Sequence, residues 1–129
     1  AFLNVKLKYL DRENELRRAI AKKYIDEINN PFISLPVIAG DEVSHVWHLF
    51  VIRTLERDSL QKHLKSAGIT TLVHYPVAPH NQEAYKEYNW LSLPITEKIH
   101  KEVLSLPMDP TMSIEDINMV IEAINRWKN

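Results

Sequence analysis

The spacing of the hydrophobic residues changes several times along this 129-residue chain, and this alternation limits the fold more than any other feature. In residues 1–30, 56–68 and 113–129, apolar side chains recur every three or four positions, as on one face of a helix. Residues 45–54 and 69–75 are instead short runs rich in valine, isoleucine, threonine and aromatic residues, which is typical of strands. The pattern predicts an α+β domain with a small three- or four-stranded, largely antiparallel sheet covered by helices.

The last helical segment has the clearest boundaries. Ser113 precedes the apolar periodicity and Asp116 follows three residues later, so the pair resembles a capping box. The expected apolar face consists of Ile114, Ile117, Val120, Ile121 and Ile124. We expect this face and Trp127 to belong to the core rather than to a binding site. Residues 56–68 predict a short amphipathic helix, and residues 94–108 predict a helix that leads into a short extended piece.

Residues 1–30 predict one long helix that ends near Asn30, where a proline-containing connector begins. No methionine and no capping residue precede its first apolar positions, so we expect a fragment of a longer protein. The alternative is that Asn4 or Asp11 caps the helix and that the residues before it fray. We therefore divide the chain into a long leading helix, residues 1–30, and a small α+β domain, residues 31–129.

Composition excludes several classes of function. The chain has 16 basic and 17 acidic residues, so it lacks the basic excess that binds a nucleic-acid backbone. Without cysteine it can form neither disulfides nor thiolate metal sites, which fits a reducing compartment. No apolar run approaches the roughly 20 residues of a membrane span. We expect a cytoplasmic protein that binds neither nucleic acid nor a membrane.

Two groups near the expected first strand are candidate binding residues. His45 and His48 are three residues apart, so on a strand they would face opposite sides and could not share a metal ion. We expect core or surface positions for both, and no metal site. Arg53 closes the same strand and could bind a substrate carboxylate with its guanidinium, although a solvated strand end is the simpler interpretation.

A second candidate region is the stretch after residues 69–75. His74, Tyr75 and His80 lie where the expected strand runs into a loop stiffened by Pro76 and Pro79. Loops held by a rigid sheet are where binding residues concentrate. From these residues alone, a ligand-binding loop and a loop whose tyrosine packs while its histidines face water are equally good interpretations.

Three stretches resemble one known family: HVWHLFVIR, then RDSLQKHLKSAGITTLVHYPVAPHNQEAY, then LPITEKIHKEVLSLPMDPTMSIEDINMVIEAI. Their order and spacing resemble the C-terminal small domain of the DegT/DnrJ-type nucleotide-sugar aminotransferases. The opening stretch KLKYLDRENELRRAIAKKY is similar to the helix that links the large and small domains of that family. The resemblance covers nearly the whole chain, and the combination of motifs is more specific than any one of them.

The resemblance implies a pyridoxal-phosphate enzyme of fold type I, a homodimer that moves an amino group from glutamate to a keto-sugar nucleotide. Such enzymes form sugars for lipopolysaccharide, other cell-wall polysaccharides and antibiotics. It also implies that the segment containing His74, Tyr75 and His80 approaches the sugar-nucleotide side of the active site. The chain has only two glycines and no segment that resembles the family's cofactor-lysine motif. We therefore expect this chain alone to bind no pyridoxal phosphate, to be inactive, and to be a monomer or weak dimer.

One rival interpretation is a free-standing α+β module that binds a small ligand or regulates another protein without catalysis. An independent hydrolase is a poorer alternative, because the sequence contains no G-x-S-x-G motif and no cysteine nucleophile. The sequence of the parent reading frame distinguishes the transferase from the free-standing module.

Overall fold

The computed structural model describes residues 2–38, 40–41 and 43–128. Ala39 and Glu42 of the expected connector, and the ends of the expected first and last helices, lie outside the described residues. The elements are α1 (Phe2–Leu7), α2 (Leu10–Glu27), β1 (Phe50–Arg53), α3 (Arg57–Ser66), the short 3-10 helices η1 (Pro79–Asn81) and η2 (Glu83–Tyr88), α4 (Pro94–Glu102), β2 (Val103–Leu106) and α5 (Ile114–Arg126).

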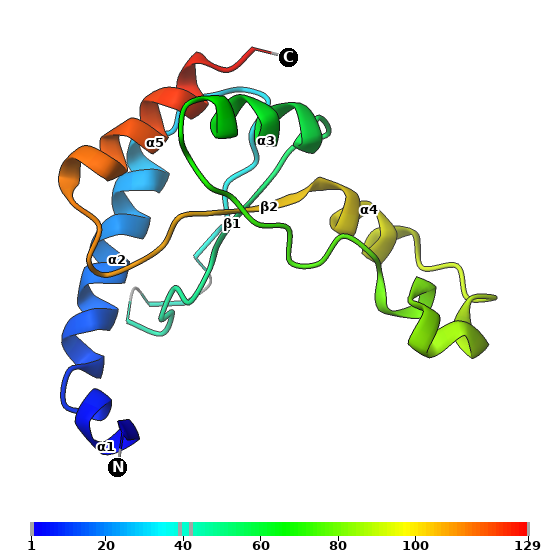
Figure 1. The fold of residues 1–129 in the computed structure, drawn as a ribbon, viewed down its shortest axis with the longest axis horizontal. Helices are drawn as coiled ribbons and strands as arrows, with labels where there is room; N and C mark the ends of the chain where they lie inside the picture. The colour runs from blue at the N-terminus through cyan, green and yellow to red at the C-terminus, as the bar shows by residue number, and fades with distance from the viewer. Residues whose placement is uncertain (1, 39, 42, 129) are drawn as a thin grey trace.

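The centre of the fold is an antiparallel pair of strands, β1 and β2. Phe50 lies opposite Leu106, and Ile52 lies opposite Leu104. All four side chains are buried, and because alternate residues of a strand share one face, they form one apolar surface. Residues of α2, α3 and α5 join this surface in a single core, and Figure 1 shows α4 apart from these helices, beyond the end of β2.

The α+β class is confirmed, with two regular strands where three or four were expected. Single antiparallel bridges, Ser34 with Arg53 and Leu72 with Ser105, stand on the two outer sides of the pair. The expected strand over residues 45–54 is wrong in its first half, because β1 begins only at Phe50. Trp47 has a φ of 49°, which no regular strand accommodates. The expected strand over residues 69–75 is reduced to the bridge at Leu72.

The helices with clear sequence boundaries are confirmed. In α5, the Ser113 hydroxyl accepts a hydrogen bond from the Asp116 N–H, and the Asp116 carboxylate accepts one from the Ser113 N–H, which makes a complete capping box. The expected apolar face of α5 is buried except for Ile114, and Trp127 is buried as expected. The helix α3 and the succession of α4 and β2 also follow the prediction.

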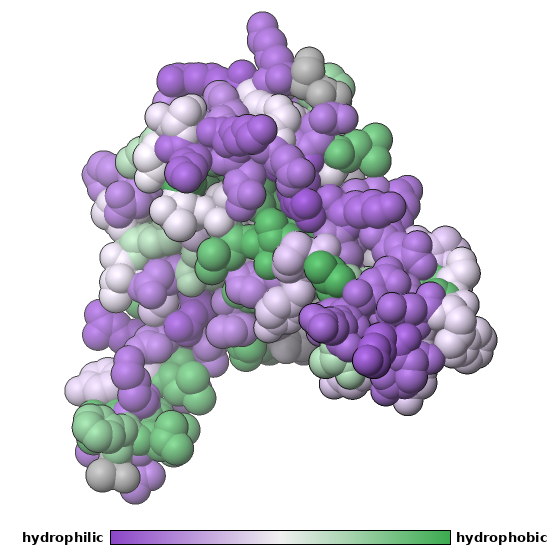
Figure 2. All heavy atoms as spheres, turned by 45° about the vertical axis from the view of Figure 1, so that its right-hand side comes forward, coloured by the Kyte–Doolittle hydropathy of each residue, from purple (hydrophilic) through white to green (hydrophobic). Residues whose placement is uncertain are grey.

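The expected long first helix is wrong in one respect, because it is interrupted. A turn at Lys8 and Tyr9 separates α1 from α2, and Tyr9, rather than Asn4 or Asp11, is the N-cap of α2. No residue of α1 is buried, and Figure 2 shows hydrophobic side chains gathered at this end of the molecule. The helix α2 enters the core only in its second half, through Ile20, Ala21 and Tyr24.

Residues 76–102, which we call the arm, carry η1, η2 and α4 and extend away from the core (Figure 1). The C-terminal end of α4 returns the chain directly to β2. None of the helices in the described part of the chain is both long and apolar enough to cross a membrane.

Candidate functional site

The face of the sheet that turns away from α2, α3 and α5 forms the floor of the candidate site. On β2, Ser105 lies between Leu104 and Leu106, so its side chain points to this opposite face. Leu72 and Ser105 exchange two backbone hydrogen bonds: the Leu72 N–H donates to the Ser105 carbonyl at 3.2 Å, and the Ser105 N–H donates to the Leu72 carbonyl at 2.7 Å. This pairing places the stretch from Thr70 to His74 along the open edge of β2.

His74 is held at this edge by one defined contact. Its Nδ1 atom forms a 2.9 Å hydrogen bond with the Ser105 hydroxyl, and Ser105 itself is buried. The bond fixes one nitrogen of the ring and leaves Nε2 available to a ligand. His74 is half-buried, so its ring is positioned by the sheet while part of it stays accessible.

A cavity of about 200 Å³ brings His74 together with His48 and Ser105. Leu72 and Met108 are among the apolar residues that complete its wall. Two imidazoles and a hydroxyl beside apolar residues suit a small ligand that has both hydroxyl groups and apolar faces.

His48 was missed as a candidate because residues 45–49 were expected to form a strand. Instead, the chain bends there: the Trp47 N–H donates to His45 Nδ1, and the two rings lie 4.0 Å apart. Because this segment is not a strand, His48 is able to line the same cavity as His74. The HVWH motif drew attention to His48, but only the tertiary structure shows that it shares a cavity with His74.

Tyr75 follows His74 and is 65% exposed. Its ring stands edge-on to the His74 ring, with centroids 5.7 Å apart. The Tyr75 carbonyl accepts a hydrogen bond from His100 Nδ1, which ties this part of the loop to α4. The backbone is thus anchored while the phenol is free to contact a ligand.

His80 is placed differently from the other loop residues. It is only 5% exposed, so the interpretation in which this histidine faces water is wrong. Its Nε2 atom lies 3.2 Å from Glu97 Oε1, and Glu97 also accepts the Leu93 N–H at 3.0 Å. These two hydrogen bonds, first that from Leu93, lower the pKa of Glu97. This arrangement joins η1 to α4 inside the arm, a structural role.

Arg53 lies outside this cavity. Its Nε atom is 3.8 Å from Glu102 Oε2, and Lys98 Nζ is 3.8 Å from the other oxygen of the same buried carboxylate. These groups line a separate cavity of about 330 Å³ on the β1 side of the sheet, beside Phe32. The structure therefore does not bring together the four residues suggested by the sequence. His74 lines the cavity and Tyr75 contacts the His74 ring, whereas Arg53 and His80 lie away from this cavity.

The sequence model of the DegT/DnrJ/EryC1/StrS aminotransferase family matches residues 1–125. The chain belongs to this family. A relative from Aneurinibacillus thermoaerophilus, dTDP-3-amino-3,6-dideoxy-alpha-D-galactopyranose transaminase, is 51% identical over 127 residues, which are 98% of this chain and 35% of the relative. The chain thus spans about a third of the length of the curated relatives it matches.

Solved structures of family members have the same fold. Streptomyces venezuelae DesV, in complex with a ketimine intermediate, matches with a TM-score of 0.91 and 40% identity over 98% of this chain and 34% of that chain. NtdA from Bacillus subtilis, with bound cofactor PMP, matches with a TM-score of 0.79 and 35% identity over 91% of this chain and 28% of that chain. The resemblance found in the sequence is confirmed.

The family implies pyridoxal phosphate, but the residues present do not fit a site for it. Within the described chain every lysine is exposed except Lys23, which is half-buried and pairs with the Glu27 carboxylate. A Schiff-base lysine must instead be enclosed against the cofactor and kept partly neutral. Among the residues that the structure describes there is also no group of three or more His, Asp or Glu side chains arranged to hold a metal ion.

Proposed function

We propose that this chain is the C-terminal small domain of a pyridoxal-phosphate aminotransferase that transfers an amino group from glutamate to a keto-sugar nucleotide. In this proposal residues 1–30 link it to the cofactor domain and residues 31–129 supply part of the substrate side. The parent enzyme is a cytoplasmic homodimer that makes an amino sugar for lipopolysaccharide or another cell-wall polysaccharide. The observation that carries the proposal is the 51% identity, over 98% of this chain, to a dTDP-amino-sugar transaminase.

The cavity at His74 is our proposed contact with the sugar. His48 and His74 offer ring nitrogens that can bond hydroxyl groups, and Tyr75 adds an exposed phenol beside them. Leu72 gives an apolar surface for the deoxygenated part of the sugar. Arg53 is proposed to stabilise the edge of the sheet through Glu102 rather than to bind substrate.

The test uses the parent enzyme with glutamate and the 3-keto form of a dTDP-6-deoxyhexose. Formation of the amino sugar nucleotide is followed by chromatography and mass spectrometry. We expect His74→Asn to raise the KM for the keto sugar about 5- to 10-fold, the effect of losing one hydrogen bond of about 1–1.4 kcal/mol. The half-reaction with glutamate should be unchanged.

His63→Asn is the matched control. His63 is also half-buried and also makes one hydrogen bond, from Nε2 to the Ala123 carbonyl at 2.9 Å, but it lies on α3, on the other side of the sheet. It should leave both half-reactions unchanged. Failure of the folded, cofactor-loaded parent enzyme to aminate any keto-sugar nucleotide would contradict the proposed reaction. Equal effects of both variants would contradict only the proposed site.

A further inference from the structure

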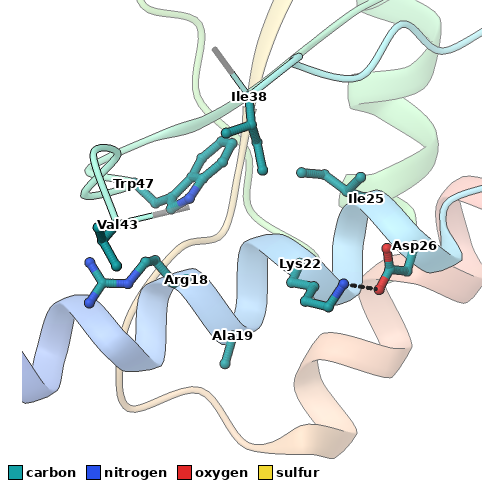
Figure 3. Close-up of a pocket in the computed structure, with 8 residues that line it drawn as sticks. All are labelled: Arg18, Ala19, Lys22, Ile25, Asp26, Ile38, Val43 and Trp47. Carbon is teal, nitrogen blue, oxygen red and sulfur yellow. Dashed lines mark ion pairs between the residues drawn. The ribbon is translucent and has the colours of Figure 1, made fainter. Parts of the chain in front are cut away.

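A third cavity, of about 350 Å³, lies between α2 and the segment that leads from α2 to β1. Arg18 and Ile25 line it from the helix, and Ile38, Val43 and Trp47 line it from the connecting segment (Figure 3). It shares no lining residue with the cavity at His74. The proposed aminotransferase reaction gives this cavity no role.

Arg18 brings to this cavity a charge that no described residue neutralises. The residue is half-buried, and within the described residues its guanidinium has neither an ion-pair partner nor a hydrogen-bond acceptor. Its neighbours differ: Arg17 pairs with Glu13, and Lys22 pairs with Asp26 at 3.1 Å. A guanidinium that has lost part of its water without gaining a partner favours the binding of an anion.

Trp47 provides a second donor without an acceptor. The residue is only 3% exposed, and no acceptor for its indole N–H is found in the described part of the chain. Figure 3 shows the indole nitrogen on the side of the ring that faces α2. In the same part of the chain, His80 Nδ1 is the only fully enclosed side-chain nitrogen or oxygen that lacks a partner. The indole N–H is therefore open to the cavity rather than sealed in the core.

The rest of the lining consists of the Lys22–Asp26 ion pair and of apolar side chains. Ile25 and Ile38 are half-buried and Val43 is exposed, and together with the Trp47 ring they form a surface that a flat hydrocarbon group can cover. Hydrophobic walls with a few converging polar groups are the usual composition of small-molecule sites. The cavity thus combines the Arg18 guanidinium, the Trp47 N–H and an apolar wall with the Lys22–Asp26 pair, in which the Asp26 carboxylate is neutralised by Lys22.

We propose that this cavity is a binding site for a small planar aromatic anion. Its carboxylate or phosphate would lie against the Arg18 guanidinium and the Trp47 N–H, and its ring would lie against Ile25 and Ile38. Because His48 directly follows Trp47, such an occupant would contact the segment that also delivers His48 to the candidate sugar site. The inference goes beyond the proposed aminotransferase function and does not depend on it.

The test is calorimetric titration of the 129-residue chain with 1-naphthyl phosphate and 1-naphthoate, which share one ring system and differ in the anionic group. The neutral 1-naphthol and the cationic 1-naphthylmethylamine are the comparison ligands. We expect one anion per chain, bound about tenfold or more tightly than either comparison ligand, as charge-assisted hydrogen bonding implies. The anion that binds more tightly shows whether the site prefers a phosphate or a carboxylate.

Two variants separate a specific site from adsorption on exposed apolar surface. Arg18→Gln should weaken the anion about tenfold or more, whereas Arg12→Gln, at an exposed position of the same helix, should leave it unchanged. In a Trp90→Phe background, the indole N–H resonance of Trp47 should shift on titration while that of Trp127 does not. Absence of binding at millimolar ligand, equal affinity for naphthol, or an unaltered affinity in Arg18→Gln with native circular dichroism would each overturn the proposal.

Discussion

Substitution of Asn30 should lower the stability of this chain more than substitution of most other polar residues, because its buried side chain donates hydrogen bonds to backbone carbonyls at the C-terminal end of α5. Its side chain is buried, and its Nδ2 atom donates to the carbonyls of Ile124 at 2.7 Å and Trp127 at 2.9 Å. Its Oδ1 atom accepts the Phe32 N–H at 3.0 Å. Carbonyls in the last turn of a helix have no partner within the helix, so Asn30 supplies what α5 lacks.

Asn30→Ala removes all three hydrogen bonds: the Trp127 carbonyl loses the Asn30 donor, and the Ile124 carbonyl keeps only the Trp127 N–H. A buried polar group left unpaired costs about 1–3 kcal/mol, and some water can enter the space, so we expect a loss of about 2–4 kcal/mol in the free energy of unfolding. With a urea m-value of about 2 kcal/mol/M, the midpoint should fall by roughly 1–2 M. Asn30→Asp, which keeps the shape but replaces the donor with an acceptor, should be at least as destabilising.

Asn125→Ala is the control for this prediction, because Asn125 makes the reciprocal contacts at the surface. Its Nδ2 atom donates to the Glu27 carbonyl at 2.9 Å, and its Oδ1 atom accepts the Asn29 N–H at 2.8 Å. Asn125 is exposed, so water can replace both bonds and the loss should stay below about 1 kcal/mol. Urea unfolding followed by circular dichroism at equal protein concentration measures all three variants. Similar losses for Asn30→Ala and Asn125→Ala would refute the reasoning that burial decides the effect.

Four further outcomes are expected. Ser113→Ala removes the cap of α5 and should lower the free energy of unfolding in urea by about 1 kcal/mol; an unchanged midpoint would contradict the capping role. His80→Ala should cost about 1–3 kcal/mol, because the ring is buried against Glu97, and an unaltered melting temperature would argue for a solvent-facing loop. The pKa of Glu97 is below its ordinary 4.5, so the stabilising effect of this carboxylate is complete above pH 4.5 and is lost as the pH falls through the lowered pKa. Glu97→Gln should therefore have a lower melting temperature than wild type near neutral pH but not in acid. A difference in melting temperature that does not depend on pH would disprove this. Finally, reduction with borohydride after mixing with pyridoxal phosphate should label the exposed lysines sparsely, whereas stoichiometric capture at one lysine would reveal a cofactor site in this chain.

The candidate site shows how far the sequence could lead. The loop after residue 74 was recognisable from its histidines, tyrosine and prolines. His74 does line a cavity, and the Tyr75 ring contacts the His74 ring. The sequence could not show that His48 and Ser105 share that cavity with His74, because they come from three separate segments. Nor could it show that His80 turns inward, since that depends on Glu97, 17 residues further along the chain.

The sequence by itself determined the elements whose signals are local. The Ser113–Asp116 capping box and the apolar face of α5, and the two leucines that α3 buries, depend on residues three or four positions apart. The family was also recognisable, because its motifs are read in order along the chain.

Only the tertiary structure decided the extent of the strands and the break between α1 and α2. A strand exists where a neighbour offers its backbone, and β1 has β2 as a neighbour only from Phe50 to Arg53, so residues 45–49 bend despite their strand-like composition. A helix is stabilised mainly by packing its apolar face, and α1 buries none of its residues, so the long helical periodicity did not produce one continuous helix. Local chemistry sets what a segment favours, and the partners that folding brings to it set how much of that preference is realised.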